Sequence, residues 1–173
     1  GQVTGRGSLQ NIHFCPVPVR DGYTVKVVAN QEIVPLLHLA LMERGDILTH
    51  CFHGSACGVL DEKGRLRASV RDAMDRGVLF DVGHGQGSFK WEVVESALEQ
   101  GLLPYTLSSD LHIYNIDGPV YDLATTISKF LHLGMTLDDA VSRSTAHPAR
   151  VLDMADVLGT LQPGAYGDAV VLK

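Results

Sequence analysis

Residues 46–52 read DILTHCF, a short, mostly apolar run with His50 near its end. Two runs of the same kind follow, GVLFDVGH at residues 77–84 and LPYTLSSD at residues 103–110. Glycine, serine or other loop-forming residues come after each run, and a segment with helical periodicity comes next. Short apolar strands that alternate with amphipathic helices are typical of βα units and a parallel sheet.

Apolar residues recur at helical spacing between and after these runs. In residues 64–76, Leu66, Val70 and Ala73 share one face, and Gly77 is placed to end the helix. We expect a second helix from a Ser88 cap to Gly101 and a third over residues 119–133. A fourth should begin at a capping box formed by Thr136 and Asp139. The last should run from Pro148, at its first helical position, to Met154.

Both ends of the chain depart from this rhythm. Residues 1–30 are assigned to no domain and are either a divergent strand, with an alternating run at residues 23–28, or sequence of another origin. Residues 158–173 carry two short extended runs around Pro163 and Gly164, which predicts a strand, a turn and a strand.

Composition and charge exclude several classes of protein. The chain has 173 residues, 45% of them hydrophobic, and a net charge of −6, with no run of lysine or arginine. Clustered positive charge is what nucleic-acid and anionic-membrane surfaces need, so we expect neither partner and expect a small-molecule substrate. The longest apolar stretch, residues 33–42, is about half of a membrane span. Three cysteines without framework spacing favour a reducing cytoplasm.

Polar residues with metal-binding or acid–base chemistry lie near the ends of the three runs. If the runs are parallel strands, side chains of one parity face one side. On that basis His50, His84 and Asp110 converge on one mouth, where active sites of α/β barrels lie. Two imidazoles and a carboxylate suit a zinc site. The alternative for each histidine is a structural role, with its ring held by hydrogen bonds.

Together, the motifs in these runs closely resemble the amidohydrolase superfamily, and within it the deacetylase and dihydroorotase-like branch. The stretches that carry the resemblance are, in order, GDILTHCFHG at 45–54, DVGHG at 81–85 with GSF at 87–89, SSDLH at 108–112, TAHPAR at 145–150 and GTLQPGAYGDAVVL at 159–172.

The resemblance implies a role for each candidate residue. His50 matches a metal ligand at the end of the sixth barrel strand, and Asp110 matches the acid–base aspartate of the eighth strand, which also belongs to the metal site. The resemblance implies a divalent metal, with zinc as the expected ion. His84 would face the substrate. His53 and His112 are further candidates for substrate binding at the mouth, with support of the ligands or plain solvation as the alternative.

The family's metal centre also needs a His-x-His pair, often a carboxylated lysine, and a histidine on the fifth strand. The sequence contains no His-x-His, and the position expected for the fifth-strand histidine falls near Val27. We therefore expect an α/β fold that is part of a (β/α)8 TIM barrel, about strands 5 or 6 to 8. Residues 31–156 would form the half-barrel, and residues 157–173 would begin a small β domain.

A half-barrel would have unpaired strand edges and, we expect, a bared apolar inner face containing Leu48, Phe52, Val78, Phe80 and Val82. Such a chain would form a homo-oligomer or pair with a second chain that completes the barrel. Two functions stay open. One is a metal-dependent hydrolase of amide, cyclic amide or ester bonds, and the other is a catalytically incomplete fragment with a structural or oligomerising role.

Overall fold

The computed structural model describes residues 14–18, 24–29 and 39–171. Its strands form one sheet in the order β1-β2-β3-β4, in which β1 is antiparallel to β2 and the other pairs are parallel. The strands are β1 Phe14–Pro18, β2 Thr24–Ala29, β3 Ile47–Thr49 and β4 Leu79–Phe80. The helices are α2 Ala68–Arg76, α3 Trp91–Glu99, α4 Leu123–His132, α5 Leu137–Ser144 and α6 Ala146–Val151.

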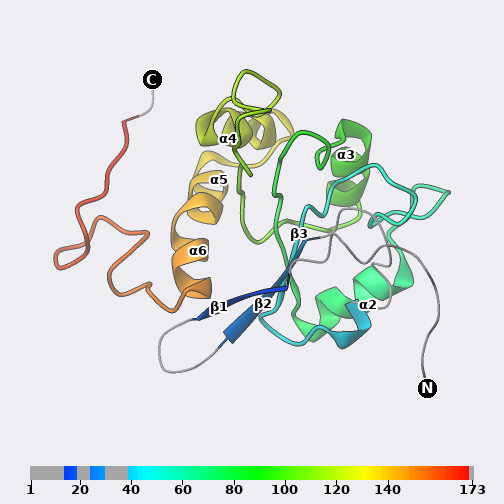
Figure 1. The fold of residues 1–173 in the computed structure, drawn as a ribbon, viewed down its shortest axis with the longest axis horizontal. Helices are drawn as coiled ribbons and strands as arrows, with labels where there is room; N and C mark the ends of the chain where they lie inside the picture. The colour runs from blue at the N-terminus through cyan, green and yellow to red at the C-terminus, as the bar shows by residue number, and fades with distance from the viewer. Residues whose placement is uncertain (1–13, 19–23, 30–38, 172–173) are drawn as a thin grey trace.

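The three predicted apolar runs lie side by side in parallel, as the βα pattern requires. Leu48 is the register partner of Phe80, and a single bridge joins Asp81 to Thr106 in the third run. That third run is an extended segment held by backbone bonds such as Tyr105 N–H to Phe80 O, 2.7 Å, and not an assigned strand. Figure 1 places α2 and α3 to one side of the strands and α4, α5 and α6 to the other.

The register corrects the predicted inner face. Leu48 and Phe80 are buried in one cluster with apolar residues of α2, α3, α4 and α5, so this face of the sheet packs against the helices. Phe52, Val78 and Val82 belong to the same cluster, and each of the five is at most 4% exposed. The expectation that these residues line a bared inner surface is therefore wrong. Because side chains alternate along a strand, the opposite face carries Thr49, Asp81 and Thr106 instead.

Helix boundaries follow the predicted caps in part. Gly77 ends α2 in the left-handed conformation, at φ +88°, and its N–H reaches Ala73 O and Met74 O. Thr136 caps α5, accepting from Asp139 N–H at 3.2 Å. The predicted Ser88 cap is wrong, because the chain is still extended two residues later, where Lys90 N–H donates to Phe52 O at 3.0 Å.

Two other helices begin elsewhere than predicted. Residues 119–122 are not helical, because the N–H groups of Val120 and Tyr121 fold back onto Asn115 O, and α4 starts after Asp122, which accepts from Thr125 N–H at 2.6 Å. The last helix begins at Ala146, so Pro148 is its third residue. Proline is tolerated there because the first-turn N–H groups have no partner within the helix.

The C-terminal segment forms the predicted turn without the predicted strands. Ala165 N–H donates to Gln162 O at 3.1 Å, around Pro163 and Gly164. No residue from 158 to 171 is assigned to a strand, and Val170 and Val171 are 84% and 88% exposed. Figure 1 shows this segment running away from the helices. In the described ranges, no helix has the length and apolar character needed to cross a bilayer.

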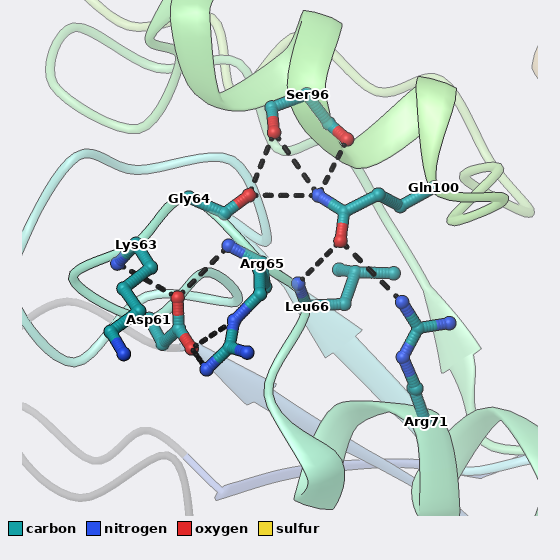
Figure 2. A network of polar contacts seen from close by, with 8 residues as sticks. All are labelled: Asp61, Lys63, Gly64, Arg65, Leu66, Arg71, Ser96 and Gln100. Carbon is teal, nitrogen blue, oxygen red and sulfur yellow. Dashed lines mark hydrogen bonds and ion pairs between the residues drawn. The ribbon is translucent and has the colours of Figure 1, made fainter.

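A polar network joins the loop before α2 to the end of α3, as Figure 2 shows. Gln100 is its centre: the side-chain amide donates to Gly64 O at 2.8 Å and to Ser96 O at 3.0 Å, and its oxygen accepts from Leu66 N–H at 2.8 Å. Asp61 closes the loop by accepting from Arg65 N–H at 2.9 Å. One glutamine side chain therefore fixes the loop that follows the β3 segment against a neighbouring helix.

Gln100→Ala removes these bonds and is expected to lower the free energy of unfolding by about 1–2 kcal/mol, since the lost bonds are partly buried. Urea denaturation followed by circular dichroism measures the change. Glu99→Ala, at the exposed neighbouring position, is the control and should stay within about 0.5 kcal/mol of the parent. Equal midpoints for the two variants would contradict the prediction.

Candidate active site

Backbone hydrogen bonds bring the ends of the three parallel segments together. Cys51 N–H donates to Asp81 O at 3.3 Å, and His84 N–H donates to Ser108 O at 3.1 Å. Gly85 N–H then donates to Ser109 O at 3.1 Å. Residues 50–51, 83–85 and 108–110 therefore form one edge, which contains three of the five predicted site residues.

His50 lies against the turn that follows β4. Its ring Nδ1 is 2.6 Å from Gly83 O, and because a carbonyl only accepts, Nδ1 carries the proton and donates. The neutral ring then has its lone pair on Nε2, the form in which histidine binds a metal. His50 is 8% exposed and has φ +59°, so the chain has left the strand and its strict alternation by this residue.

Asp110 lies on the other side of the same turn. A Cβ built on Gly85 would be 2.8 Å from Asp110 Oδ2, so this carboxylate rests directly on the glycine backbone. Asp110 is exposed and has φ +46°. Its backbone carbonyl accepts from Asn115 Nδ2 at 2.9 Å, and Asn115 is fully buried. His50 and Asp110 thus contact the same short turn, His50 at Gly83 and Asp110 at Gly85.

His84, between the two glycines, has both ring nitrogens engaged. Nδ1 donates to Gly85 O at 2.8 Å, and Nε2 accepts from Lys129 Nζ at 2.6 Å. The ring stacks on Phe89, with centroids 4.4 Å apart, and is 2% exposed. Burial, followed by the Lys129 cation, lowers the pKa of His84, and burial also lowers the pKa of Lys129. A substrate-facing role for His84 stays a prediction.

The other two histidines lie in separate local turns. His53 is buried, and its Nδ1 accepts from Ser55 N–H at 3.2 Å and contacts Ser55 Oγ. Burial, and then the charge of His50, lowers the pKa of His53. His112 is exposed, and its Nδ1 accepts from Tyr114 N–H at 3.2 Å. Their predicted part in substrate binding stays a prediction.

Sequence reasoning missed the most connected group at this edge, the buried carboxylate of Asp81. It accepts from the hydroxyls of Thr49 at 2.6 Å, Ser108 at 2.7 Å and Thr106 at 2.5 Å. A signal was available, because an aspartate inside the apolar run LFDV needs partners and the next run, TLSS, is rich in hydroxyls. Lys129 was also missed, and its position in an amphipathic helix gave no signal.

Comparison with known proteins identifies the family of the chain. The sequence model described as "Amidohydrolase family" matches residues 47–173, about three quarters of the chain. The chain belongs to the amidohydrolase family. This confirms the resemblance carried by the motifs at residues 45–54, 81–89 and 108–112, and the fold is that of part of an amidohydrolase barrel.

Individual relatives of this amidohydrolase are longer than the chain itself. A deacetylase of Enterococcus faecalis is 38% identical over 155 residues, which cover 82% of this chain and 42% of the relative. A deacetylase of Brucella anthropi is 38% identical over 117 residues, which cover 68% of this chain and 29% of the relative.

Two solved structures are similar in fold as well as in sequence. The crystal structure of an adenine deaminase has a TM-score of 0.75 and 39% identity, covering 80% of this chain and 38% of that one. The crystal structure of a dihydroorotase has a TM-score of 0.68 and 34% identity, and the match covers 74% of this chain and 35% of that one. The chain therefore spans about two fifths or less of the length of each of these relatives.

Amidohydrolases generally bind divalent metals, and the residues of this chain fit such an ion in part. His50 has the tautomer of a ligand, and Asp110 offers an exposed carboxylate. Within residues 39–171, whose side chains the structure describes, no group of three or more His, Cys, Asp or Glu could hold a metal. Catalytic zinc sites use about three protein ligands. The described residues therefore account for part of a donor set.

Gly83 is the tightest point of the site. It has φ +47°, and an added Cβ would lie 2.6 Å from His50 Nδ1 and would also clash with Thr49 Oγ1. We expect Gly83→Ala to cost about 1–3 kcal/mol more than Gly101→Ala, measured by urea denaturation. Gly101 is the matched control, because its φ is +90° but nothing lies within 4 Å of its Cβ position. Equal costs would mean that only the backbone conformation matters.

Stability should fall as the pH is lowered from about 7.5 to 5.5. The folded chain lowers the pKa of His53 and of His84, so below the ordinary pKa of histidine, near 6.5, the unfolded chain binds more protons. Urea midpoints across this range measure the effect. His84→Gln, which retains an oxygen acceptor for Lys129, should flatten the slope. The prediction fails if the variant loses stability with pH as steeply as the parent.

Proposed function

We propose that this amidohydrolase chain carries the acid–base residue and part of the metal site of a hydrolase that cleaves C–N bonds in amides or cyclic amides, or ester bonds. The observation that supports this most directly is that His50 and Asp110 both contact the turn at residues 83–85, His50 at Gly83 and Asp110 at Gly85. The relatives described above, a deacetylase, an adenine deaminase and a dihydroorotase, support a hydrolase that acts on C–N bonds.

In this proposal His50 provides a metal ligand through Nε2, because Gly83 O holds the proton on Nδ1. A bound divalent metal, which we propose to be zinc, would polarise the substrate carbonyl and lower the pKa of water. The remaining ligands would come from residues outside the described ranges, from a second copy in a homo-oligomer, or from another chain that completes the barrel.

Asp110 is proposed as the acid–base group. Its carboxylate is exposed, and its backbone is fixed by the bond to buried Asn115, so it presents an oxygen at the mouth without being buried itself. It would take the proton from the attacking water and then give it to the leaving nitrogen or oxygen. His84, His53 and His112 are proposed to contact the substrate or to shape its surroundings.

A second candidate function is favoured by one observation. Among the residues with described side chains, no cluster of three metal donors exists. If the chain works with those residues alone, it is a structural or oligomerising member of the family in which His50 and Asp110 do no chemistry.

Zinc stoichiometry separates the two candidates. We expect about one or two zinc ions per chain after loading and removal of loose ions, measured by elemental analysis, and a clear loss in His50→Ala. His132→Ala, in α4 and exposed, is the matched control and should keep its zinc. No zinc in the parent would favour the structural function.

Activity tests the role of Asp110 separately. On N-acetylated amines and cyclic amides, Asp110→Asn should lose about 100-fold or more of any turnover that the parent has, with an unchanged circular dichroism spectrum. Undiminished turnover in this folded variant would remove Asp110 from the proposal.

A further inference from the structure

We propose that Asp81 is a positioning residue for His50, and that it acts through the hydroxyl of Ser108 and the backbone of Gly83. The inference rests on the metal-ligand role proposed for His50. It concerns how the chain fixes the protonated nitrogen and the direction of that ring.

The first step is the direction of the hydrogen bonds around Asp81. A carboxylate accepts only, so the hydroxyls of Thr49, Ser108 and Thr106 must all donate to it. Ser108 has then used its proton, and its oxygen is left as an acceptor. That oxygen lies 3.0 Å from Gly83 N, which donates to it. Asp81 thus orients Ser108 to receive the N–H of the turn.

The second step is the orientation of the Gly83 carbonyl. Gly83 N–H is held by Ser108 Oγ, and the next N–H, that of His84, is held by Ser108 O at 3.1 Å. One residue therefore clamps the backbone before and after Gly83. In a trans peptide the carbonyl points opposite to the following N–H. Gly83 O is thereby turned away from Ser108 and toward His50.

The third step is the effect on His50. Gly83 O accepts from Nδ1 at 2.6 Å, which keeps the proton on Nδ1 and the lone pair on Nε2. The contact is close because Gly83 has no side chain, and a Cβ there would strike both the His50 ring and Thr49 Oγ1. Thr49 is itself a partner of Asp81, so the same carboxylate holds both Thr49 Oγ1 and, through Ser108, the backbone of Gly83.

Thr106 provides a test of whether Asp81 is merely a satisfied buried charge. Its hydroxyl donates to Asp81 Oδ1, whereas Ser108 donates to Oδ2, and only Ser108 continues to Gly83. Loss of either hydroxyl removes one bond from the same carboxylate. If the connection between Asp81 and Gly83 runs through Ser108, loss of the Ser108 hydroxyl disturbs Gly83 and loss of the Thr106 hydroxyl leaves it in place.

The experiment uses the full chain without metal and reads the tautomer of His50 at one fixed pH by ¹⁵N NMR. We expect the parent to carry the proton on Nδ1. Ser108→Ala should shift the population toward the Nε2 tautomer or broaden the ring signals, Thr106→Val should not, and Ser108→Thr should restore the parent signals. A parent ring protonated on Nε2 would overturn the proposal, even if Ser108→Ala did not fold, and so would equal effects of Ser108→Ala and Thr106→Val.

Zinc affinity, measured by competition with a chromogenic chelator, is the second readout. We expect Ser108→Ala to bind zinc about 10-fold more weakly than Thr106→Val, in line with the loss of a group that orients a metal-bound histidine. The two proposals fail differently. A tautomer that depends on Ser108 in a chain without zinc affinity would reject the metal role alone. Zinc bound through His50, with a tautomer that does not change when Ser108 is replaced, would reject the positioning role of Asp81.

Discussion

The burial of the Asp81 carboxylate is the constraint on which the arrangement of this edge depends. A charge that is 7% exposed must be compensated by hydrogen bonds, and here three hydroxyls provide them, one from the segment of β3 and two from the segment on the other side of Asp81. A shift of one residue in either neighbouring segment would turn Thr49 or Thr106 to the helix-covered face and leave Asp81 short of a donor. Polar pairing therefore fixes the same register that the apolar core fixes from the other side.

Backbone conformation connects this register to the site. His50, Gly83, Gly85 and Asp110 all have positive φ, so each parallel segment turns sharply where its regular pairing ends. Period-two alternation stops at these turns, and the direction of a side chain is set instead by local bonds such as His50 Nδ1 to Gly83 O. The contacts of His50 and Asp110 with residues 83–85 are consequently a property of the turns and not of the strands.

The sequence predicted the parallel order of the three runs, the family and several helix ends, because glycine at 77 and threonine at 136 act through local backbone chemistry. It failed where distant partners decide the outcome. Parity assigned Leu48 and Phe80 to a bared inner face, since periodicity alone does not say which side the helices cover. Ser88 was predicted as a cap, yet pairing of Lys90 with Phe52 keeps that stretch extended. The hydrogen bond between Lys129 and His84 joins residues 45 positions apart and left no local pattern.

Because Leu48 and Phe80 pack against the helices, the residues that stabilise the fold lie on a different face of the sheet from Asp81. Leu48 and Phe80 are sealed beneath the helices, so the apolar core does not depend on what lies across the inner face. The opposite face carries the buried Asp81 carboxylate, whose hydrogen bonds are supplied within the chain by Thr49, Thr106 and Ser108. Association therefore need not follow from apolar exposure at these strands. Within residues 39–171, His50 and Asp110 supply part of a set of metal donors, so what this part of the chain leaves incomplete is the chemistry of the site and not the packing of the core.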